Sequence, residues 1–527
     1  MKYYVAASLL VVCSLGAATA FDGSRWWSHV QFLASDDLQG RDTGSPGHKK
    51  AVEYVTAQFE RDGLKPAGEQ GYIQPVKFIS KVLDESKSSV TLVKGGKEMP
   101  IKLGDEAIIG TRVDPASAVE AELVFVGYGL RIPEKNYDDF AGLETKGRIA
   151  VTIAGVPASV PGALASHYQS AAERAGTLKS LGFVGSLSLQ NPHHMDIPWS
   201  RVASNRSQPT MQLSAPGMYE SEGLKIGLAW NPARAEILLA GTGHKFDELV
   251  ELAEAGKPLP HFALNARLKV RTAVKHADVE SQNVAAIFPG SDPKLKDEYV
   301  VFSAHIDHVG NSGAPINGDN IFNGAMDNAS GTAAALDIAA HLKETGIKTK
   351  RSILFVIVTA EEKGLLGSKY YAAHPTVAGK NIVADINSDM FLPLFPLKIV
   401  TAYGLDESTL GDDLKAVAAA MGMKVQPDPE PVRNVFIRSD QYNFIVKGVP
   451  SIMADFGYEK GSKEEKMEKD WLANRYHAPS DDLNQPLDKA AAGRYIEMLE
   501  KFLLRVANAD HKPAWKPESF FKRYSNN

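Results

Sequence analysis

Cysteine is almost absent from this chain of 527 residues, since the only one is Cys13. Cys13 lies in an apolar stretch that follows Lys2 and ends in small residues at Ala20. A basic start, an apolar centre and a small-residue end are typical of a secretory signal peptide, here expected over residues 1–20 with cleavage after Ala20. The mature chain would have no thiol, so it could form no disulfide, use no cysteine nucleophile and hold no metal through sulfur. Any metal would be held by histidine and carboxylate side chains.

A surplus of basic residues is absent too. The chain has 58 Lys and Arg against 63 Asp and Glu, a formal net charge of −5. Without a basic stripe, nucleic acid is not an expected partner. The N-terminal apolar stretch is shorter than the ~20 residues that span a bilayer, so a retained membrane anchor is the less favoured alternative. After cleavage we expect no stable membrane association and a secreted or periplasmic protein, whose oligomeric state the sequence leaves open.

The length of the chain predicts two or three domains. From about residue 115 to 265 short strands and turns dominate, which indicates a separate inserted domain rich in β-structure. From residue 283 onward, apolar strand-like runs alternate with helical segments. This alternation predicts an α/β fold whose mostly parallel, mixed central sheet is covered by helices on both faces. A helix expected from about His48 to Gly63 would pack on that sheet.

Residue types that bind metals stand at the ends of several strand-like runs. Each candidate follows such a run or lies beside a sharp turn, and the five are His305, Asp327, Glu362, Asp389 and His477. The run from Val300 to Phe302, for example, would deliver His305 to a crevice at the carboxyl end of a strand. Asp307, two residues further on, could orient its imidazole. Two zinc ions that share one carboxylate would use the whole set.

Each of these residues has an ordinary structural explanation when it is taken alone. A single histidine is more often structural or exposed than a ligand. An adjacent pair such as Glu361 and Glu362 commonly forms a solvated face or the first turn of a helix. Acidic residues that end separate buried strands, with a histidine at both ends of the set, are harder to explain, because buried charges need partners or a metal.

Six segments carry a resemblance to a known family. They read HIDH, NGAMDNASGTAAALDIA, TAEEKGLLGS, NSDM, RSDQYNF and YHAPSDDLN, within residues 283–505. The chain resembles the co-catalytic zinc exopeptidase family, which includes secreted bacterial aminopeptidases, glutamate carboxypeptidase, the transferrin receptor ectodomain and glutaminyl cyclases. Segments such as YDDFAGLETKGRIAVTIAG resemble a protease-associated domain. The implied division is a signal peptide (1–20), the N-terminal part of the peptidase domain (21–114), a protease-associated insert (115–265) and the zinc peptidase catalytic domain (266–527).

The resemblance also implies a role for each candidate ligand. Asp327 would bridge two zinc ions per chain, and the peptide bond from Asp327 to Asn328 would be cis. The remaining ligands would complete the two sites, Glu362 and His477 at one zinc, His305 and Asp389 at the other. His308, the second histidine of HIDH, is not expected to bind metal.

Four further residues acquire catalytic or substrate-binding roles from the resemblance. Glu361 would be the general base that takes one proton from the metal-bridging water and so leaves a hydroxide, and Asp307 would support the first histidine ligand. Tyr476 would donate a hydrogen bond to the developing oxyanion, and Arg438 would contact substrate. The insert is expected to shape access to the site, and its His193 and His194 are interpreted as an exposed pair.

The function implied is a secreted di-zinc metallopeptidase that hydrolyses peptide bonds at chain ends, with an aminopeptidase favoured. An aminopeptidase needs an acidic or carbonyl-lined pocket for the free amine, whereas a carboxypeptidase of the glutamate carboxypeptidase kind needs an Arg or Lys clamp. Both stay open. Acyl transfer of the glutaminyl cyclase kind would use one zinc. A binding protein that had lost its enzyme function would lack several ligands, all of which this chain retains.

Overall fold

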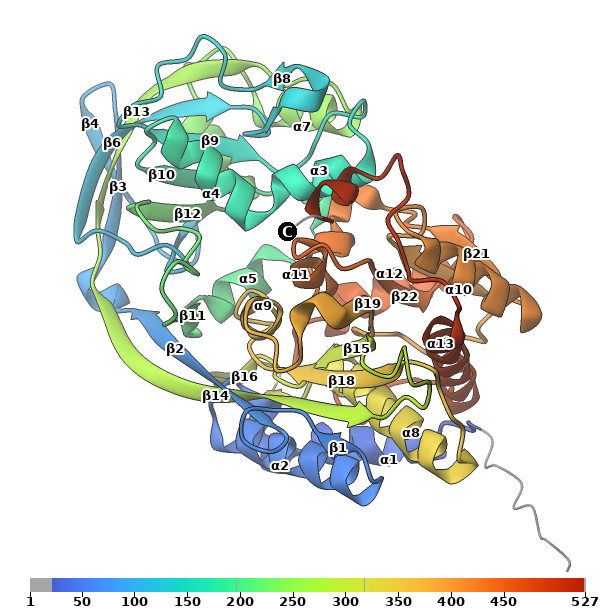
Figure 1. The fold of residues 1–527 in the computed structure, drawn as a ribbon. Helices are drawn as coiled ribbons and strands as arrows, with labels where there is room; N and C mark the ends of the chain where they lie inside the picture. Colours follow the sequence, from blue (N-terminus) through green and yellow to red (C-terminus); the bar gives the residue numbers. More distant parts are fainter. Residues whose placement is uncertain (1–20, 196, 317, 526–527) are drawn as a thin grey trace, which may run out of the picture.

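The computed structural model describes residues 21–195, 197–316 and 318–525. Cys13, the expected signal peptide and its cleavage after Ala20 lie outside the described residues. Within the described part of the chain, no helix combines the length and the apolar character needed to cross a bilayer. The chain folds around two large β-sheets, one in the lower half and one in the upper half of Figure 1.

The lower sheet has ten strands and a parallel centre. Its order is β11-β2-β14-β18-β15-β19-β22-β20-β21, with β1 (Lys65–Pro66) paired beside β14. The parallel centre consists of β18 (Ser352–Val358), β15 (Tyr299–His305), β19 (Ile382–Asn387) and β22 (Ser451–Phe456). Antiparallel pairing flanks it through β14 (Val274–Phe288) on one side and β20 (Ile399–Tyr403) on the other; β21 (Lys424–Pro427) ends the sheet. The predicted mixed α/β sheet is confirmed.

Helices cover both faces of this sheet, because alternate strand residues are buried on opposite sides. In β18, Phe355 joins one apolar core and Val356 the other. The helices of the first face are α1 (Ser24–Leu33), α2 (Pro46–Arg61), α8 (Ser330–Thr345) and α13 (Lys489–Asn508); those of the second are α9 (Leu366–Ala373) and α11 (Gln441–Ile445). Helix α2 begins two residues before the expected start, because the Ser45 hydroxyl accepts from the His48 N–H at 3.1 Å as its N-cap.

The upper sheet has eight strands in the order β4-β3-β13-β6-β9-β10-β12-β5. Along the chain these are β3 (Ser89–Lys94), β4 (Lys97–Ile101), β5 (Ala107–Gly110), β6 (Ala118–Val126), β9 (Ile149–Ile153), β10 (Gly185–Leu189), β12 (Ile226–Trp230) and β13 (His261–Arg271). It has an apolar core of its own, to which the helices α3 (Gly162–Gln169), α6 (Ala235–Leu239) and α7 (Phe246–Glu254) contribute.

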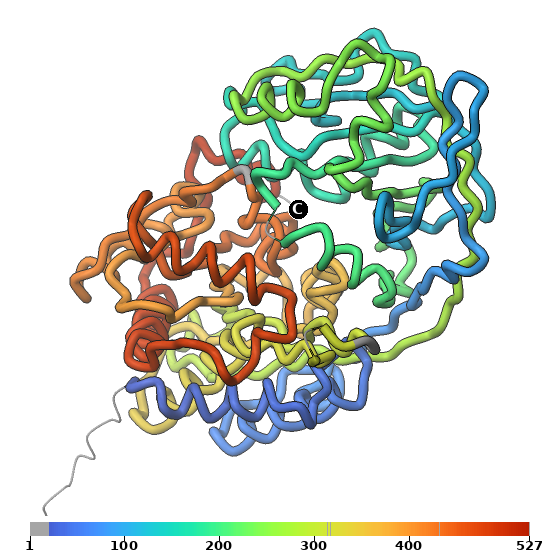
Figure 2. The backbone as a smooth tube through the Cα atoms, turned by 180° about the vertical axis from the view of Figure 1, so that it is seen from behind, coloured from blue at the N-terminus to red at the C-terminus, as the bar shows by residue number. Residues whose placement is uncertain are grey.

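The upper sheet does not coincide with the expected insert at residues 115–265. Strands β3, β4 and β5 precede residue 115 and still belong to it. Strand β11 (Thr210–Leu213) lies within that range but pairs with β2 (Ile73–Leu83) of the lower sheet. Strand β4 follows β3 as a hairpin, but β3 pairs with β13, β5 with β12 and β11 with β2, all far apart in the chain, so no local pattern reveals these pairings. The long strands β2 and β14 run side by side at the edge that joins the two halves (Figures 1 and 2).

Candidate metal centre and active site

The candidate ligands gather at one edge of the lower sheet, where the central parallel strands end. His305 ends β15, Asp327 lies in the turn before α8, Glu362 follows β18, Asp389 follows β19, and His477 follows α12 (Lys463–Arg475). The carboxyl ends of parallel strands meet at the same edge, which is where open α/β sheets form their crevices. The peptide bond between Asp327 and Asn328 is cis, as the resemblance implies.

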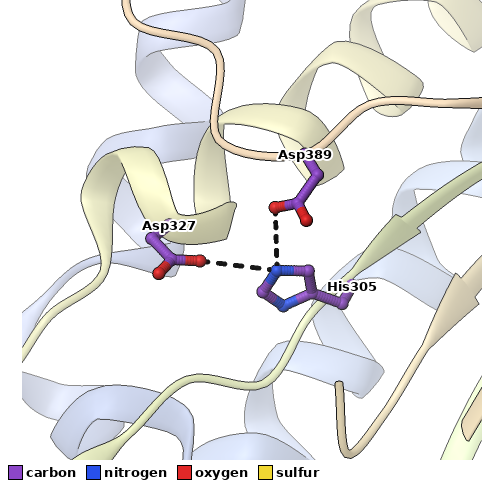
Figure 3. Close-up of side chains that lie close together, drawn as sticks. All are labelled: His305, Asp327 and Asp389. Atoms are coloured by element: carbon purple, nitrogen blue, oxygen red, sulfur yellow. Dashed lines mark hydrogen bonds and ion pairs between the residues drawn. The ribbon is translucent and has the colours of Figure 1, made fainter. Parts of the chain in front are cut away.

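One group of ligand atoms forms around His305. Its Nε2 lies 3.1 Å from Asp389 Oδ1 and 3.4 Å from Asp327 Oδ1, and all three side chains point toward one another in Figure 3. The ligand atoms of these three residues lie within 4.8 Å of one another. The other ring nitrogen, Nδ1, lies 3.1 Å from the carbonyl oxygen of Asp307; in the tautomer whose Nδ1–H donates to that oxygen, Nε2 keeps its lone pair for a metal ion.

A second group forms on the other side of Asp327. His477 Nε2 lies 3.1 Å from Asp327 Oδ2 and 3.1 Å from Glu362 Oε2. Asp327 therefore presents one oxygen to His305 and the other to His477. A carboxylate in this arrangement is suited to bridge two cations.

His308 also lies in the second group, although the sequence reasoning set it aside. Its Nδ1 is 2.7 Å from Glu362 Oε1 and 3.8 Å from Asp327 Oδ2, and the side chain is buried. His308, Asp327 and Glu362 could hold a metal ion by their spacing. The ring fits because Gly324 has no side chain; a Cβ there would lie 2.6 Å from it. His308 and His477 thus face different oxygens of Glu362.

The Asp307 carboxylate supports the turn that follows β18. Its Oδ1 accepts from the Glu361 N–H at 3.0 Å, and its Oδ2 accepts from the Glu362 N–H at 3.4 Å and the Thr43 hydroxyl at 3.1 Å. The carboxylate is 3.9 Å from His305 Nδ1, so the main chain of Asp307, and not its side chain, makes the hydrogen bond to the imidazole. The residue therefore positions both the first histidine and the Glu361–Glu362 pair.

Three residues that the sequence reasoning missed hold the loops of the site. Asp481 accepts hydrogen bonds from the backbone N–H groups of Met326 and Asp327, at 2.9 and 3.0 Å. The other two are Thr43, which bonds Asp307, and the fully buried Arg41, whose guanidinium donates to the carbonyl groups of Ile306 and Gly324. The only sequence signal for Asp481 is its place in YHAPSDDLN after His477. Thr43 and Arg41 stand in a loop rich in Gly and Asp that shows no such signal.

Burial and crowding of carboxylates shift the ionisation of the site. Burial, with the charges of Asp389 and Glu362, raises the pKa of Glu361 well above its usual value. Burial likewise raises the pKa of Asp307 to about 6. Burial alone would lower the pKa of His305, but the facing carboxylates raise it well above 6.5. Such a concentration of buried negative charge is what divalent cations neutralise, and imidazole with carboxylate is a donor set that zinc accepts.

The remaining expected site residues line a cleft between the two halves of the molecule. Arg438 Nη2 lies 3.5 Å from the Tyr476 hydroxyl, and both side chains line the cleft together with His477. Burial raises the pKa of Tyr476 to about 12, so its phenol stays a hydrogen-bond donor at neutral pH. Asn191 and His194 form the opposite wall. His194 Nε2 is 2.8 Å from a Glu254 carboxylate oxygen of the same half, and His193 does not join the candidate metal groups.

Comparison with known proteins gives consistent matches. Residues 283–503 match the model described as Peptidase family M28. Carboxypeptidase Q of Xenopus laevis is 25% identical over 374 residues, 69% of this chain and 65% of the relative, so the chain spans slightly less than two thirds of that protein. Leupeptin-inactivating enzyme 1 of Streptomyces exfoliatus is 32% identical over 169 residues, 32% of this chain and 34% of the relative. The solved aminopeptidase from Aneurinibacillus sp. strain AM-1 aligns with a TM-score of 0.56 at 20% identity, covering 95% of this chain and 97% of that one, which is a likeness of fold.

Proposed function

We propose that the chain, whose residues 283–503 match Peptidase family M28, is a di-zinc exopeptidase that acts as an aminopeptidase. The observation that carries the proposal is the placement of Asp327, which presents Oδ1 to His305 at 3.4 Å and Oδ2 to His477 at 3.1 Å. One carboxylate shared between two histidine-containing groups is what a pair of zinc ions requires.

The residues that would hold the metals follow from the two groups. His305 and Asp389 would serve one ion and His477 and Glu362 the other, with Asp327 shared and His308 close to Glu362. The chemistry that two bound zinc ions would supply is a lowered pKa of a water molecule and polarisation of the scissile carbonyl. The raised pKa of Glu361 favours its role as general base, because it can take the proton of the attacking water and pass it to the leaving amine.

Two other groups act on the substrate. The Tyr476 phenol would donate a hydrogen bond to the carbonyl oxygen as negative charge develops there, and loss of such a donor usually costs ~3 kcal/mol in the transition state. Arg438, beside the Tyr476 hydroxyl, would contact the substrate main chain or a terminal carboxylate. Asp307 would act through the hydrogen bonds that it accepts from Glu361 and Glu362.

Acidic residues beside the ligands favour the aminopeptidase. A pocket that contains Asp327, Glu361 and Asp389 extends to two more carboxylates, Asp455 and Glu468. A free α-amine is positively charged, and these carboxylates can bind it through ion pairs and hydrogen bonds. Arg438 and Arg433 also line this pocket, and two guanidinium groups could clamp a terminal carboxylate, so a carboxypeptidase is the second candidate.

We further propose that the upper sheet and its helices form a protease-associated domain that narrows access to the cleft. Residues 1–20 would act as a cleaved signal that directs the protein to the periplasm or the medium. The substrates would be short peptides, which a narrowed opening admits more readily than folded chains.

The test is a substrate screen with the zinc-loaded protein, comparing free-amine dipeptides with N-blocked, free-carboxyl dipeptides. An aminopeptidase cleaves only the first set and a carboxypeptidase the second. Cyclisation of N-terminal glutamine together with one zinc per chain would instead support acyl transfer. No turnover in any of these assays, by protein that carries two zinc ions, would refute the proposal.

The role of Glu361 is tested by Glu361→Gln, which keeps the shape of the side chain but cannot accept a proton at neutral pH. We expect both zinc ions to stay bound and kcat to fall by about 100-fold or more. Glu500→Gln is the matched control, since Glu500 is also buried and bonded, to His341 Nδ1 at 2.7 Å, but lies in α13. Near-normal kcat in Glu361→Gln would show that another group is the base.

A further inference from the structure

One arginine in the segment that links β10 of the upper sheet to β11 of the lower sheet contacts the segment that carries Tyr476 and His477. Arg201 lies in α5 (Trp199–Ser204), within the residues expected for the insert. Its Nη1 donates to the carbonyl oxygen of Tyr476 at 2.7 Å, and its Nη2 donates to the carbonyl oxygen of Ala473 at 2.8 Å. The guanidinium therefore donates hydrogen bonds to two main-chain carbonyl groups, one in the last turn of α12 and one directly after it.

The segment after α12 has reasons to need such support. The last four carbonyl groups of a helix have no partner within it, and Ala473 is among these because α12 ends at Arg475. Two residues later the backbone of His477 takes a φ of 51°, in the left-handed region that side chains with a Cβ seldom occupy. Such a conformation persists only where the surroundings hold it.

Among the described residues, the main-chain hydrogen bonds that the lower half makes to this segment lie on either side of Tyr476 and His477; the Ala478 N–H, for example, donates to the Arg475 carbonyl oxygen at 3.0 Å. The Arg475 guanidinium donates to the Ser480 carbonyl, and the Ser480 hydroxyl donates to the Asn474 carbonyl at 2.9 Å. Arg201 bonds the carbonyl of Tyr476, directly before His477. A planar guanidinium suits this task, since its fixed fork of N–H groups can serve two acceptors while its charge complements the helix C-terminus.

We propose that Arg201 is a positioning residue of the active site, supplied by the segment that connects the upper sheet to the lower one. By clamping Ala473 and Tyr476 it fixes the backbone that aims the phenol of Tyr476 into the cleft and holds His477 Nε2 at 3.1 Å from Asp327 and Glu362. Its effect on turnover rests on the proposed peptidase function. Its effect on the order of the segment does not.

This role changes what removal of residues 115–265 would mean. If the insert only shaped access to the site, the deletion would widen the opening and leave the chemistry intact. It would also remove Arg201 and strand β11, which pairs with β2 and packs Met211 and Leu213 against the lower sheet. Loss of activity in that variant would therefore not report on access alone, and single substitutions are the sharper test.

The experiment uses the full, zinc-loaded chain with Arg201→Met, which keeps the aliphatic length but no donor, and Arg201→Gln as a second variant. The matched control is Arg206→Met, because the Arg206 guanidinium donates two hydrogen bonds to Glu85, at 2.7 and 3.1 Å, and one to the Ala203 carbonyl at 2.6 Å, but none to residues 473–477. We expect kcat to fall about 10- to 100-fold in the Arg201 variants, the range for partners that orient metal ligands, while KM changes much less. Arg201→Lys, which retains the charge and a donor, should recover part of the loss.

Hydrogen exchange supplies the readout that does not depend on turnover. Backbone exchange over residues 474–479 should accelerate in the Arg201 variants and stay at the wild-type rate in Arg206→Met. If the wild-type protein cleaves no peptide, the proposed function fails, but the exchange rates still test whether Arg201 orders residues 474–479. A kcat and an exchange rate at the wild-type level in either folded Arg201 variant would overturn the inference, as would an equal loss in Arg206→Met.

Discussion

Replacement of Asp307 by asparagine separates metal binding from the positioning of the catalytic glutamate. The carboxylate accepts from the N–H groups of Glu361 and Glu362 and from the Thr43 hydroxyl. The amide keeps one acceptor, but its NH2 group must face a backbone donor. His305 keeps its bond to the Asp307 carbonyl oxygen, because that atom belongs to the main chain.

The magnitude follows from the hydrogen bonds that are lost. A hydrogen bond to a charged group contributes roughly 1.5–3 kcal/mol, and removing one from the support of Glu361 should lower kcat about 10- to 100-fold. The same range is typical of residues that orient the ligands of a metal site. Zinc content should stay close to that of the unaltered protein, since all five ligand side chains remain.

The assay combines steady-state kinetics on a cleaved dipeptide with the zinc content per chain measured by elemental analysis. Asp413→Asn is the control, since Asp413 is buried to a similar degree and bonded to Arg505 at 2.7 Å, far along the chain in α10 (Thr409–Ala420). An unchanged kcat in Asp307→Asn with full zinc would refute the reasoning. Loss of zinc in parallel with activity would instead assign Asp307 to metal retention.

Two further predictions concern metal stoichiometry and acid stability. Asp327→Ala should lose both metals together on dialysis, because its two oxygens face separate groups; one zinc retained at full affinity would exclude a bridging role. His48 is buried, and burial lowers the pKa of its imidazole from 6.5 to about 3. Below pH 6.5 the imidazole is therefore protonated in the unfolded chain but not in the folded one, so the free energy of unfolding decreases as the pH falls. From neutral pH to pH 5 this loss should be roughly 2 kcal/mol, and His48→Leu should reduce the pH dependence measured by denaturant titration, whereas exposed His261→Gln should not. Equal slopes in all three proteins would contradict the assignment to His48.

The order of the elements in the lower half could be predicted from the sequence. Strands that are buried on both faces are continuous apolar runs. The residues from Val300 to Phe302 and the run before Thr359 have this pattern and are buried, so the sequence alone predicts that both belong to a sheet covered on two faces. The carboxyl ends of parallel strands lie at the same edge of the sheet, so the sequence alone groups His305, Glu362 and Asp389. Asp327 and His477 were grouped with them by motif and order.

The tertiary structure alone decided how these residues face one another. The sequence placed His308 outside the metal groups, but the fold brings its ring to 2.7 Å from Glu362, because Gly324 leaves room for it. The sequence also suggested that the Asp307 side chain orients His305. In the structure the main-chain carbonyl of Asp307 lies beside the imidazole, and the carboxylate accepts hydrogen bonds from the turn that follows β18. Side-chain direction at a turn depends on contacts from distant loops, and these leave no periodic trace.

The same limit applies to the boundary between the two halves and to Arg201. Strands β3 and β5 pair with β13 and β12, which lie far along the chain, and β11 crosses back to pair with β2. An arginine in a polar stretch appears in the sequence as a surface residue. Only the packing of α5 against the end of α12 gives Arg201 its two carbonyl partners, because hydrogen bonds between distant segments are determined by the folded geometry and not by local pattern.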